Sequence, residues 1–198
     1  MGSGGSGFDS FRRTLKHTQH VFDSWHRLSG KHMDVLDIGG GFTSISSNPM
    51  SNFENVAPQV EDYISKEWPA KNKNIKIIGE PGRQIAEGSM ALCTQVFLAK
   101  KQGNYQHLHV NSGVYSGFGC RIFEDANILG QPLLPEAELR TRFTDLKPTF
   151  IWGQTCDGID YLTKDELYPR IEQGEWMIFR NMGAYNQPTE TTFNGFEV

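Results

Sequence analysis

Two kinds of apolar pattern alternate along the first part of the chain, and this alternation limits the folds open to it. Apolar side chains recur three or four residues apart over residues 8–28 and again over residues 53–68, the spacing of amphipathic helices. Short, mostly apolar runs at residues 33–38 and 75–78 follow the two stripes and are typical of strands. The pattern predicts the order α-β-α-β, with neighbouring parallel strands.

Each of these two expected strands ends in a loop rich in glycine. Parallel strands bring their carboxyl ends to the same edge of a sheet, where α/β folds bind ligands. Glycines let backbone N–H groups approach an anion, and an arginine can add a bidentate clamp, so the two loops together predict a phosphate site. For either loop alone, the simpler interpretation is favoured: the three glycines form a tight turn, and the arginine is a solvated charge. The residues concerned are Gly39, Gly40 and Gly41 after the first strand, and Glu80, Gly82 and Arg83 after the second.

The pattern changes near residue 90. Residues 91–99 are mostly apolar, and residues 107–110 alternate between histidine and aliphatic side chains, as in a half-buried strand. Further strands are expected around residues 114–123, 149–152 and 176–179. The chain therefore divides into a Gly/Ser linker or tag at 1–7, an α/β part at 8–90 and a β part at 91–198.

A cysteine and an aspartate stand side by side between two glycines, directly after an apolar strand. Cys156 and Asp157 lie between Gly153 and Gly158, so the loop can present a thiol and a carboxylate to a ligand. A free cysteine is more often a small buried hydrophobic residue, and that alternative stays open on these residues alone.

Composition excludes several classes of function. The 198 residues carry 19 basic and 23 acidic side chains, a formal charge of 19 − 23 = −4, which argues against a nucleic-acid partner. No apolar stretch approaches the length of a membrane span. Three widely spaced cysteines predict neither a disulfide framework nor a zinc site and indicate the reducing cytoplasm. The histidine pairs at 17/20 and 107/109 lack partners for a metal, and we expect none.

Six ordered motifs resemble the eukaryotic-type ornithine decarboxylases. They belong to the pyridoxal-phosphate decarboxylases with an alanine-racemase-like barrel, and the resemblance covers nearly all of residues 8–198. It implies the carboxyl-terminal part of a (β/α)₈ TIM-type barrel followed by an all-β domain, of Greek-key barrel or sandwich type, in a homodimer with shared sites. The motifs are Leu-Asp-Ile-Gly-Gly-Gly-Phe (36–42), Gly-Glu-Pro-Gly-Arg (79–83), Val-Asn-Ser-Gly-Val-Tyr (110–115), Trp-Gly-Gln-Thr-Cys-Asp-Gly (152–158), Asn-Met-Gly-Ala-Tyr (181–185) and Thr-Phe-Asn-Gly-Phe (192–196).

The resemblance also implies a role for each motif. The glycine loops with Arg83 and Tyr185 would hold the phosphate of pyridoxal 5'-phosphate, and Glu80 would face the pyridine nitrogen. Cys156 would protonate the substrate carbon after carbon dioxide leaves, and Asp157 would bind the distal amine. The activity implied is that of a lyase of polyamine biosynthesis, which converts ornithine to putrescine.

Two departures from the family pattern leave alternatives open. Phe123 and Glu124 stand where the ornithine enzymes usually have Tyr-Asp, so lysine and arginine stay open as substrates. No lysine here matches the family's cofactor-binding lysine, so the chain resembles the distal half of the enzyme. An amino-terminal half would then complement it.

A regulatory relative without catalysis is the main alternative function. It would resemble the antizyme inhibitors, and an antizyme-like regulator would be a possible partner. Retention of Cys156, Asp157, Glu80, Arg83 and Tyr185 favours the enzyme. A racemase of the same fold is a third alternative, which the Cys-Asp loop does not suit.

Overall fold

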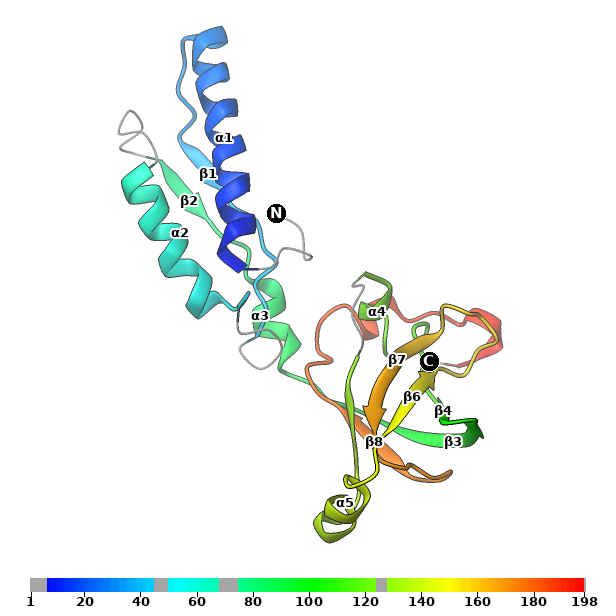
Figure 1. Ribbon diagram of the computed structural model, residues 1–198. Helices are drawn as coiled ribbons and strands as arrows, with labels where there is room; N and C mark the ends of the chain where they lie inside the picture. Colours follow the sequence, from blue (N-terminus) through cyan, green and yellow to red (C-terminus); the bar gives the residue numbers. More distant parts are fainter. Residues whose placement is uncertain (1–6, 45–49, 68–74, 124–127, 198) are drawn as a thin grey trace. The chain divides into compact units, whose positions relative to one another are not determined.

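The chain folds into two compact units, one of residues up to Gly88 and one from Ser89 onward, which we name the α/β unit and the sheet unit. The structure is a computed structural model and describes residues 7–44, 50–67, 75–123 and 128–197 (Figure 1). None of the helices in these ranges is long and apolar enough to cross a membrane.

The α/β unit contains three helices and two strands among its described residues. In chain order they are α1 (Gly7–Ser29), β1 (Val35–Asp37), α2 (Phe53–Glu67), β2 (Lys76–Ile78) and α3 (Gly82–Glu87). β1 and β2 pair in parallel, with Leu36 opposite Ile77. The expected α-β-α-β order and the parallel pairing of the two strands are therefore confirmed.

The core of the α/β unit forms where the apolar stripes of its two long helices meet β1. Phe11 of α1 stacks on Phe42, which follows the glycine loop, with ring centroids 4.9 Å apart. The helix ends follow the usual polar rules: Asp9 lies in the first turn of α1, and the side chain of Asn52 accepts the N–H of Asn55 at the start of α2. The buried cluster consists of Phe11, Leu15, Leu36, Phe42, Val56, Val60 and Tyr63.

The sheet unit is built on one mixed sheet of six strands in the order β5-β8-β3-β4-β6-β7. β4 and β6 are parallel, and every other neighbouring pair is antiparallel. The elements are β3 (Leu92–Gln102), β4 (Tyr105–Val110), α4 (Cys120–Phe123), β5 (Gly130–Pro132), α5 (Glu136–Arg142), β6 (Lys147–Trp152), β7 (Tyr161–Tyr168), β8 (Trp176–Phe179), and two 3₁₀ turns, η2 (Gln187–Thr189) and η3 (Phe193–Gly195).

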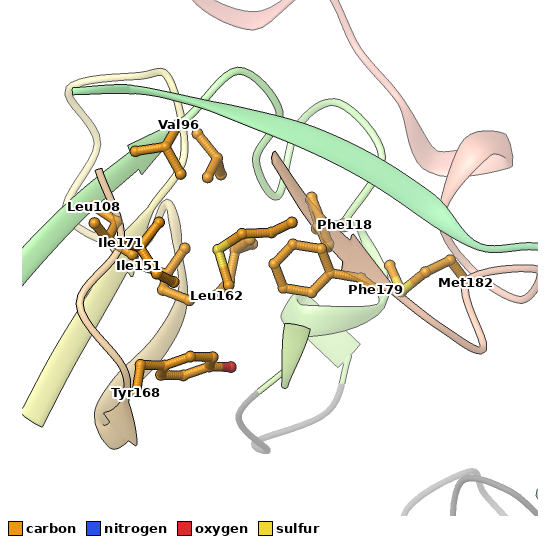
Figure 2. Packing of buried hydrophobic residues seen from close by; sticks show 11 residues of the cluster. Val96, Leu108, Phe118, Ile151, Leu162, Tyr168, Ile171, Phe179 and Met182 are labelled. Carbon is orange, nitrogen blue, oxygen red and sulfur yellow. The ribbon is translucent and has the colours of Figure 1, made fainter. Parts of the chain in front are cut away.

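One face of this sheet carries the core. Phe118 meets Phe179 edge to face, with centroids 4.8 Å apart, and Leu108, Ile151 and Leu162 of three strands are fully buried in the same cluster (Figure 2). Apolar residues at alternate positions of the strands thus supply the interior, as their period of two requires.

The prediction of a strand around residues 114–123 is wrong. This segment forms turns and then the single turn of α4, because the N–H groups of Ser116 and Phe118 both bond back to the carbonyl of Gly113. Gly117 has φ +109°, a backbone conformation that favours glycine and interrupts an extended strand. The β part therefore also contains two short helices, α4 and α5.

Candidate functional site

The Cys-Asp loop is the connection between the antiparallel strands β6 and β7. Trp152 and Tyr161 face each other at its base as the last register pair of the two strands. Directly above them, the N–H of Gly153 donates to the carbonyl of Asp160 at 2.8 Å, and the N–H of Asp160 donates to the carbonyl of Asp157 at 3.0 Å. The loop therefore has a hydrogen-bonded frame of its own.

A buried carboxylate holds this loop in place. Asp160 is 1% exposed, and its side chain accepts the N–H of Val114 at 2.8 Å, the N–H of Thr155 at 2.9 Å and the Thr155 hydroxyl at 2.7 Å. A methyl group added to Gly113 or Gly153 would overlap the same carboxylate. Glycine at both positions therefore lets two distant segments close around one anion.

Cys156 and Asp157 are displayed at the tip of the loop. The thiol of Cys156 is exposed, and the side-chain amide of Asn194 donates to its Sγ at 3.7 Å. One oxygen of Asp157 accepts the Tyr115 hydroxyl at 2.6 Å, and the other accepts the N–H of Ile159 at 3.1 Å. The two groups singled out from the sequence thus stand next to each other with defined polar partners.

The hydrogen bond between Tyr115 and Asp157 separates their protonation states. The Tyr115 hydroxyl, with the N–H of Ile159, lowers the pKa of Asp157 below its ordinary value. The same hydrogen bond, with burial and the nearby carboxylates, raises the pKa of Tyr115 to about 12. Asp157 is therefore a carboxylate at neutral pH, which suits a cationic ligand.

The segment near the carboxyl end closes over this arrangement. The ring of Phe193 stacks on that of Tyr115 with centroids 4.2 Å apart, and the N–H of Thr191 donates to the carbonyl of Tyr115 at 2.9 Å. Asn194, which reaches Cys156, has φ +60°. Three of the sequence motifs therefore meet at the Cys-Asp loop.

Phe123 and Tyr185 lie near each other in the sheet unit. Their ring centroids are 6.2 Å apart, and both side chains are exposed, Phe123 to 60% and Tyr185 to 46%. Tyr185 has φ +58°, a conformation uncommon for a residue other than glycine. Glu124 lies outside the described residues.

The two glycine loops of the α/β unit contact each other. The N–H of Glu80 donates to the carbonyl of Gly39 at 3.0 Å, and a Cβ on Gly40 would lie 2.5 Å from the carbonyl oxygen of Glu80. Gly39 and Gly41 have φ of +69° and +91°. Gly82 has open space where a side chain would stand. Glycine at these positions lets the two loop backbones approach each other closely.

The side chain of Arg83, in the second glycine loop, is buried and not solvated. Its guanidinium is buried in α3, where Nη1 lies 4.0 Å from Glu87. Glu87 in turn accepts the N–H of Ser44 at 2.7 Å. Arg83 thus has a structural carboxylate partner, while Glu80 at the end of β2 is exposed.

Sequence reasoning missed two residues of the site. Asp160 closes the Cys-Asp-Gly-Ile-Asp run, yet only the fold shows that its side chain turns back onto the loop. Tyr115 belongs to a recognised motif, yet its contact with Asp157 joins positions 42 residues apart. The paired glycines, Gly113 and Gly153, were the signal in the sequence for a close approach.

The histidines of β4 are packed against aromatic rings. The ring of His107 stacks on Phe150 at 5.0 Å, and those of His107 and His109 lie 6.5 and 6.4 Å from Trp152. Within the described ranges, no group of three or more histidine, cysteine, aspartate or glutamate side chains could hold a metal ion.

A sequence profile of the family "Pyridoxal-dependent decarboxylase, C-terminal sheet domain" matches residues 21–183. The chain belongs to this family. Among curated pyridoxal-dependent decarboxylases, it is similar to the ornithine decarboxylase of Caenorhabditis elegans, with 32% identity over 99% of this chain and 47% of the relative. Ornithine decarboxylase 2 of Drosophila melanogaster is 31% identical over 100% of this chain and 49% of its own length.

Solved structures of pyridoxal-dependent decarboxylases share the fold. The arginine decarboxylase of Paramecium bursaria Chlorella virus bound to agmatine has a TM-score of 0.77 and 29% identity, over 99% of this chain and 50% of that one. The lysine/ornithine decarboxylase of Vibrio vulnificus complexed with cadaverine has a TM-score of 0.73 and 25% identity, over 100% and 51%. The chain spans about half the length of these relatives.

Proposed function

We propose that this chain is the distal part of a pyridoxal-phosphate-dependent decarboxylase of a basic amino acid, with ornithine converted to putrescine and carbon dioxide. The observation that carries the proposal is the exposed thiol of Cys156 beside the ionised carboxylate of Asp157, on a loop fixed by Asp160. Membership of the pyridoxal-dependent decarboxylases supports it, as do the names of the curated relatives.

The two loop residues would do different work. Asp157 would bind the distal ammonium group of the substrate, because Tyr115 keeps it ionised at neutral pH. Cys156 would deliver a proton to the carbon that has lost carbon dioxide, and the amide of Asn194 would orient the sulfur. Pyridoxal phosphate, when bound, supplies the electron sink that makes loss of carbon dioxide possible.

The α/β unit would bind the cofactor. β1, α2, β2 and α3 would form part of a (β/α)₈ barrel, with the glycine loops at the carboxyl ends of its strands. Gly39, Gly40, Gly41 and Gly82 would hold the phosphate, with Arg83 and Tyr185 contributing, as the family resemblance implies. Glu80, exposed beside that loop, would face the pyridine nitrogen.

The active assembly would be a homodimer in the cytoplasm, in which each Cys-Asp loop completes a site with the partner's barrel. Phe123 and Glu124 would contact the far end of the substrate, with Tyr185 beside Phe123. Lysine and arginine are the alternative substrates. The similarity to arginine and lysine/ornithine decarboxylases of known structure supports testing both.

The test combines cofactor binding with carbon dioxide release. Visible absorbance of bound pyridoxal phosphate and release of labelled carbon dioxide from ornithine, lysine and arginine are measured on the chain alone and after addition of a relative's amino-terminal half. We expect release with the added half, and loss of at least about 100-fold in Cys156→Ala, in the range of general acid–base catalysis. In Asp157→Asn we expect a raised KM, because the variant loses the charge that binds the distal ammonium group.

Cys93→Ala is the matched control, because Cys93 is also exposed but lies on β3. Activity equal in Cys156→Ala and Cys93→Ala would contradict the role of the loop. Absence of both cofactor absorbance and carbon dioxide release with all three amino acids would favour a non-catalytic, antizyme-inhibitor-like function.

A further inference from the structure

The sheet unit has a polar cavity of about 580 Å³ at the end where β4 and β6 begin. Its walls come from the hairpin of β3 and β4, the segment that leads into β6, and the connection from β7 to β8. Ala99 and Ile171 join its inner side to the apolar core. β6 begins here at Lys147 and reaches the Cys-Asp loop only after Trp152, so the cavity and the loop lie at opposite ends of this strand.

The floor of the cavity is a buried glutamine. Gln106 is 8% exposed, and its side-chain amide donates to the Thr149 hydroxyl at 3.0 Å and to the carbonyl of Pro169 at 3.1 Å. Its side-chain oxygen accepts the N–H of Ile171 at 2.9 Å. Both N–H donors of the amide are therefore used, and the connection from β7 to β8 is fixed to β4 and β6. The floor is thus ordered by the protein itself.

Strand register brings two lysines to the face of the sheet that carries Gln106. Lys101 of β3 is the register partner of Gln106, which in turn pairs with Thr149 of β6. Residues directly opposite on neighbouring strands share a face, and so do residues two apart on one strand. Lys147 stands two residues before Thr149. Lys101 and Lys147 therefore project toward the same cavity from strands on either side of β4.

The residues that line the cavity have an excess of positive charge. Four are basic and two acidic, a formal charge of 4 − 2 = +2, in a chain whose formal charge is −4. Within the described ranges, neither Lys100 nor Lys101 forms an ion pair. The charged residues are Lys100, Lys101, Asp145, Lys147, Arg170 and Glu172.

The two ion pairs at the cavity are both open to solvent. Lys147 pairs with Asp145 at 2.6 Å, and their side chains are 40% and 74% exposed. Arg170 pairs with Glu172 at 3.1 Å, and their side chains are 78% and 53% exposed. Exposed pairs of this kind contribute little to stability, and each cation keeps further N–H donors. Both cations can therefore bind an additional anion.

We propose that this cavity, which we name the basic cavity, binds a compact anion with two negative groups, of the diphosphate or dicarboxylate class. β4 lies between β3 and β6, so Lys101 and Lys147 start from backbones about 10 Å apart. An anion with two groups can contact both lysines, with Arg170 beside the second, whereas a single small ion contacts one. Binding links three segments of the sheet unit and stabilises it by mass action. This inference does not depend on the proposed function.

The first measurement locates the anion by amide hydrogen exchange on the full chain. Exchange over residues 99–106 and 170–173 is compared in pyrophosphate, in succinate and in sodium chloride at matched ionic strength. We expect pyrophosphate to slow exchange there at least about threefold. Protection by pyrophosphate alone identifies phosphate groups as the ligand, and equal protection by succinate identifies the pair of charges. Exchange at the glycine loops, residues 39–41 and 80–83, is followed separately in the same experiment.

The second measurement tests the lysines by titration with pyrophosphate. Lys101→Gln and Lys147→Gln should each raise the half-saturating concentration at least about fivefold, because each removes a charge-assisted hydrogen bond. Lys101→Arg keeps the charge and should stay within about twofold of the unsubstituted chain. Arg140→Gln is the matched control, since it also removes one positive charge, from an exposed arginine of α5 that pairs with Glu136. Binding should weaken as ionic strength rises.

Three results would overturn the proposal. One is exchange over residues 99–106 and 170–173 that is the same in pyrophosphate as in sodium chloride. Another is protection confined to the glycine loops, which would place the anion in the α/β unit. The third is an equal half-saturating concentration in Lys101→Gln, Lys147→Gln and Arg140→Gln, which would show that general charge and not the basic cavity attracts the anion.

Discussion

The backbone N–H of Val114 donates a 2.8 Å hydrogen bond to the side chain of Asp160, which joins two segments 46 residues apart at one buried anion. The loop that displays Cys156 is thereby held by a side chain that itself has no contact with the exterior. Asp160 therefore fixes the positions of the Cys156 thiol and the Asp157 carboxylate.

Asp160→Asn is expected to destabilise the sheet unit by about 1–3 kcal/mol. The amide nitrogen of the asparagine would face an N–H or O–H group that now donates a hydrogen bond to the carboxylate. Denaturant unfolding measures the change. Asp165→Asn is the control, since Asp165 is exposed on β7 and its φ of +60° is tolerated by asparagine. Equal stability of the two variants would show that Asp160 is not the anchor.

Gly153→Ala should cost roughly 1–3 kcal/mol, because the added methyl overlaps the Asp160 carboxylate and the frame of the loop has to shift. Gly158 lies in the same loop with open space around it, so Gly158→Ala should change the free energy of unfolding by less than about 0.5 kcal/mol. Thermal unfolding of both variants separates overlap from any general effect of alanine in the loop.

Tyr115→Phe should make stability less dependent on pH at both extremes. The lowered pKa of Asp157 contributes stability that is present above its ordinary value of 3.8 and is lost as pH falls through the folded value. The raised pKa of Tyr115, about 12 against an ordinary 10.0, contributes stability that is present below pH 10 and is lost as pH rises toward 12.

Unfolding curves across pH measure the effect of Tyr115→Phe, and an NMR titration of Asp157 should show its pKa rise in the variant. An unchanged pKa for Asp157 would contradict the role of the hydroxyl. Tyr105→Phe serves as control, because Tyr105 is exposed on β4 and its ring packs on Phe150.

Asn194→Gly should lower the alkylation rate of Cys156 by about two- to fivefold, because the variant loses the side-chain amide that donates to Sγ and orients the sulfur. Glycine keeps the backbone conformation at φ +60°. Asn181→Gly is matched in φ and should leave the rate unchanged. Labelling measured by peptide mass spectrometry distinguishes Cys156 from the exposed Cys93.

The positions of β1 and β2 could be predicted because apolar periodicity reports local structure and burial directly. The Cys-Asp loop could be found for a similar reason, since two glycines bracket Cys156 and Asp157 within six residues. Both features depend on residues that are close in sequence.

The hydrogen bonds from Tyr115 to Asp157 and from Val114 to Asp160 could not be predicted, because they depend on how distant strands pair. The same limit explains the wrong strand at residues 114–123. Apolar residues there pack into the core through turns at Gly113 and Gly117, which the periodic pattern does not reveal.

The parallel pairing of β4 with β6 has a consequence for how the protein folds. Residues 111–146 separate the two strands, so β6 cannot pair with β4 as part of a local hairpin. Contacts between such distant segments form slowly because a long loop must close first. We therefore expect the hairpin of β6 and β7, which carries Cys156 in its connecting loop, to dock on β4 late.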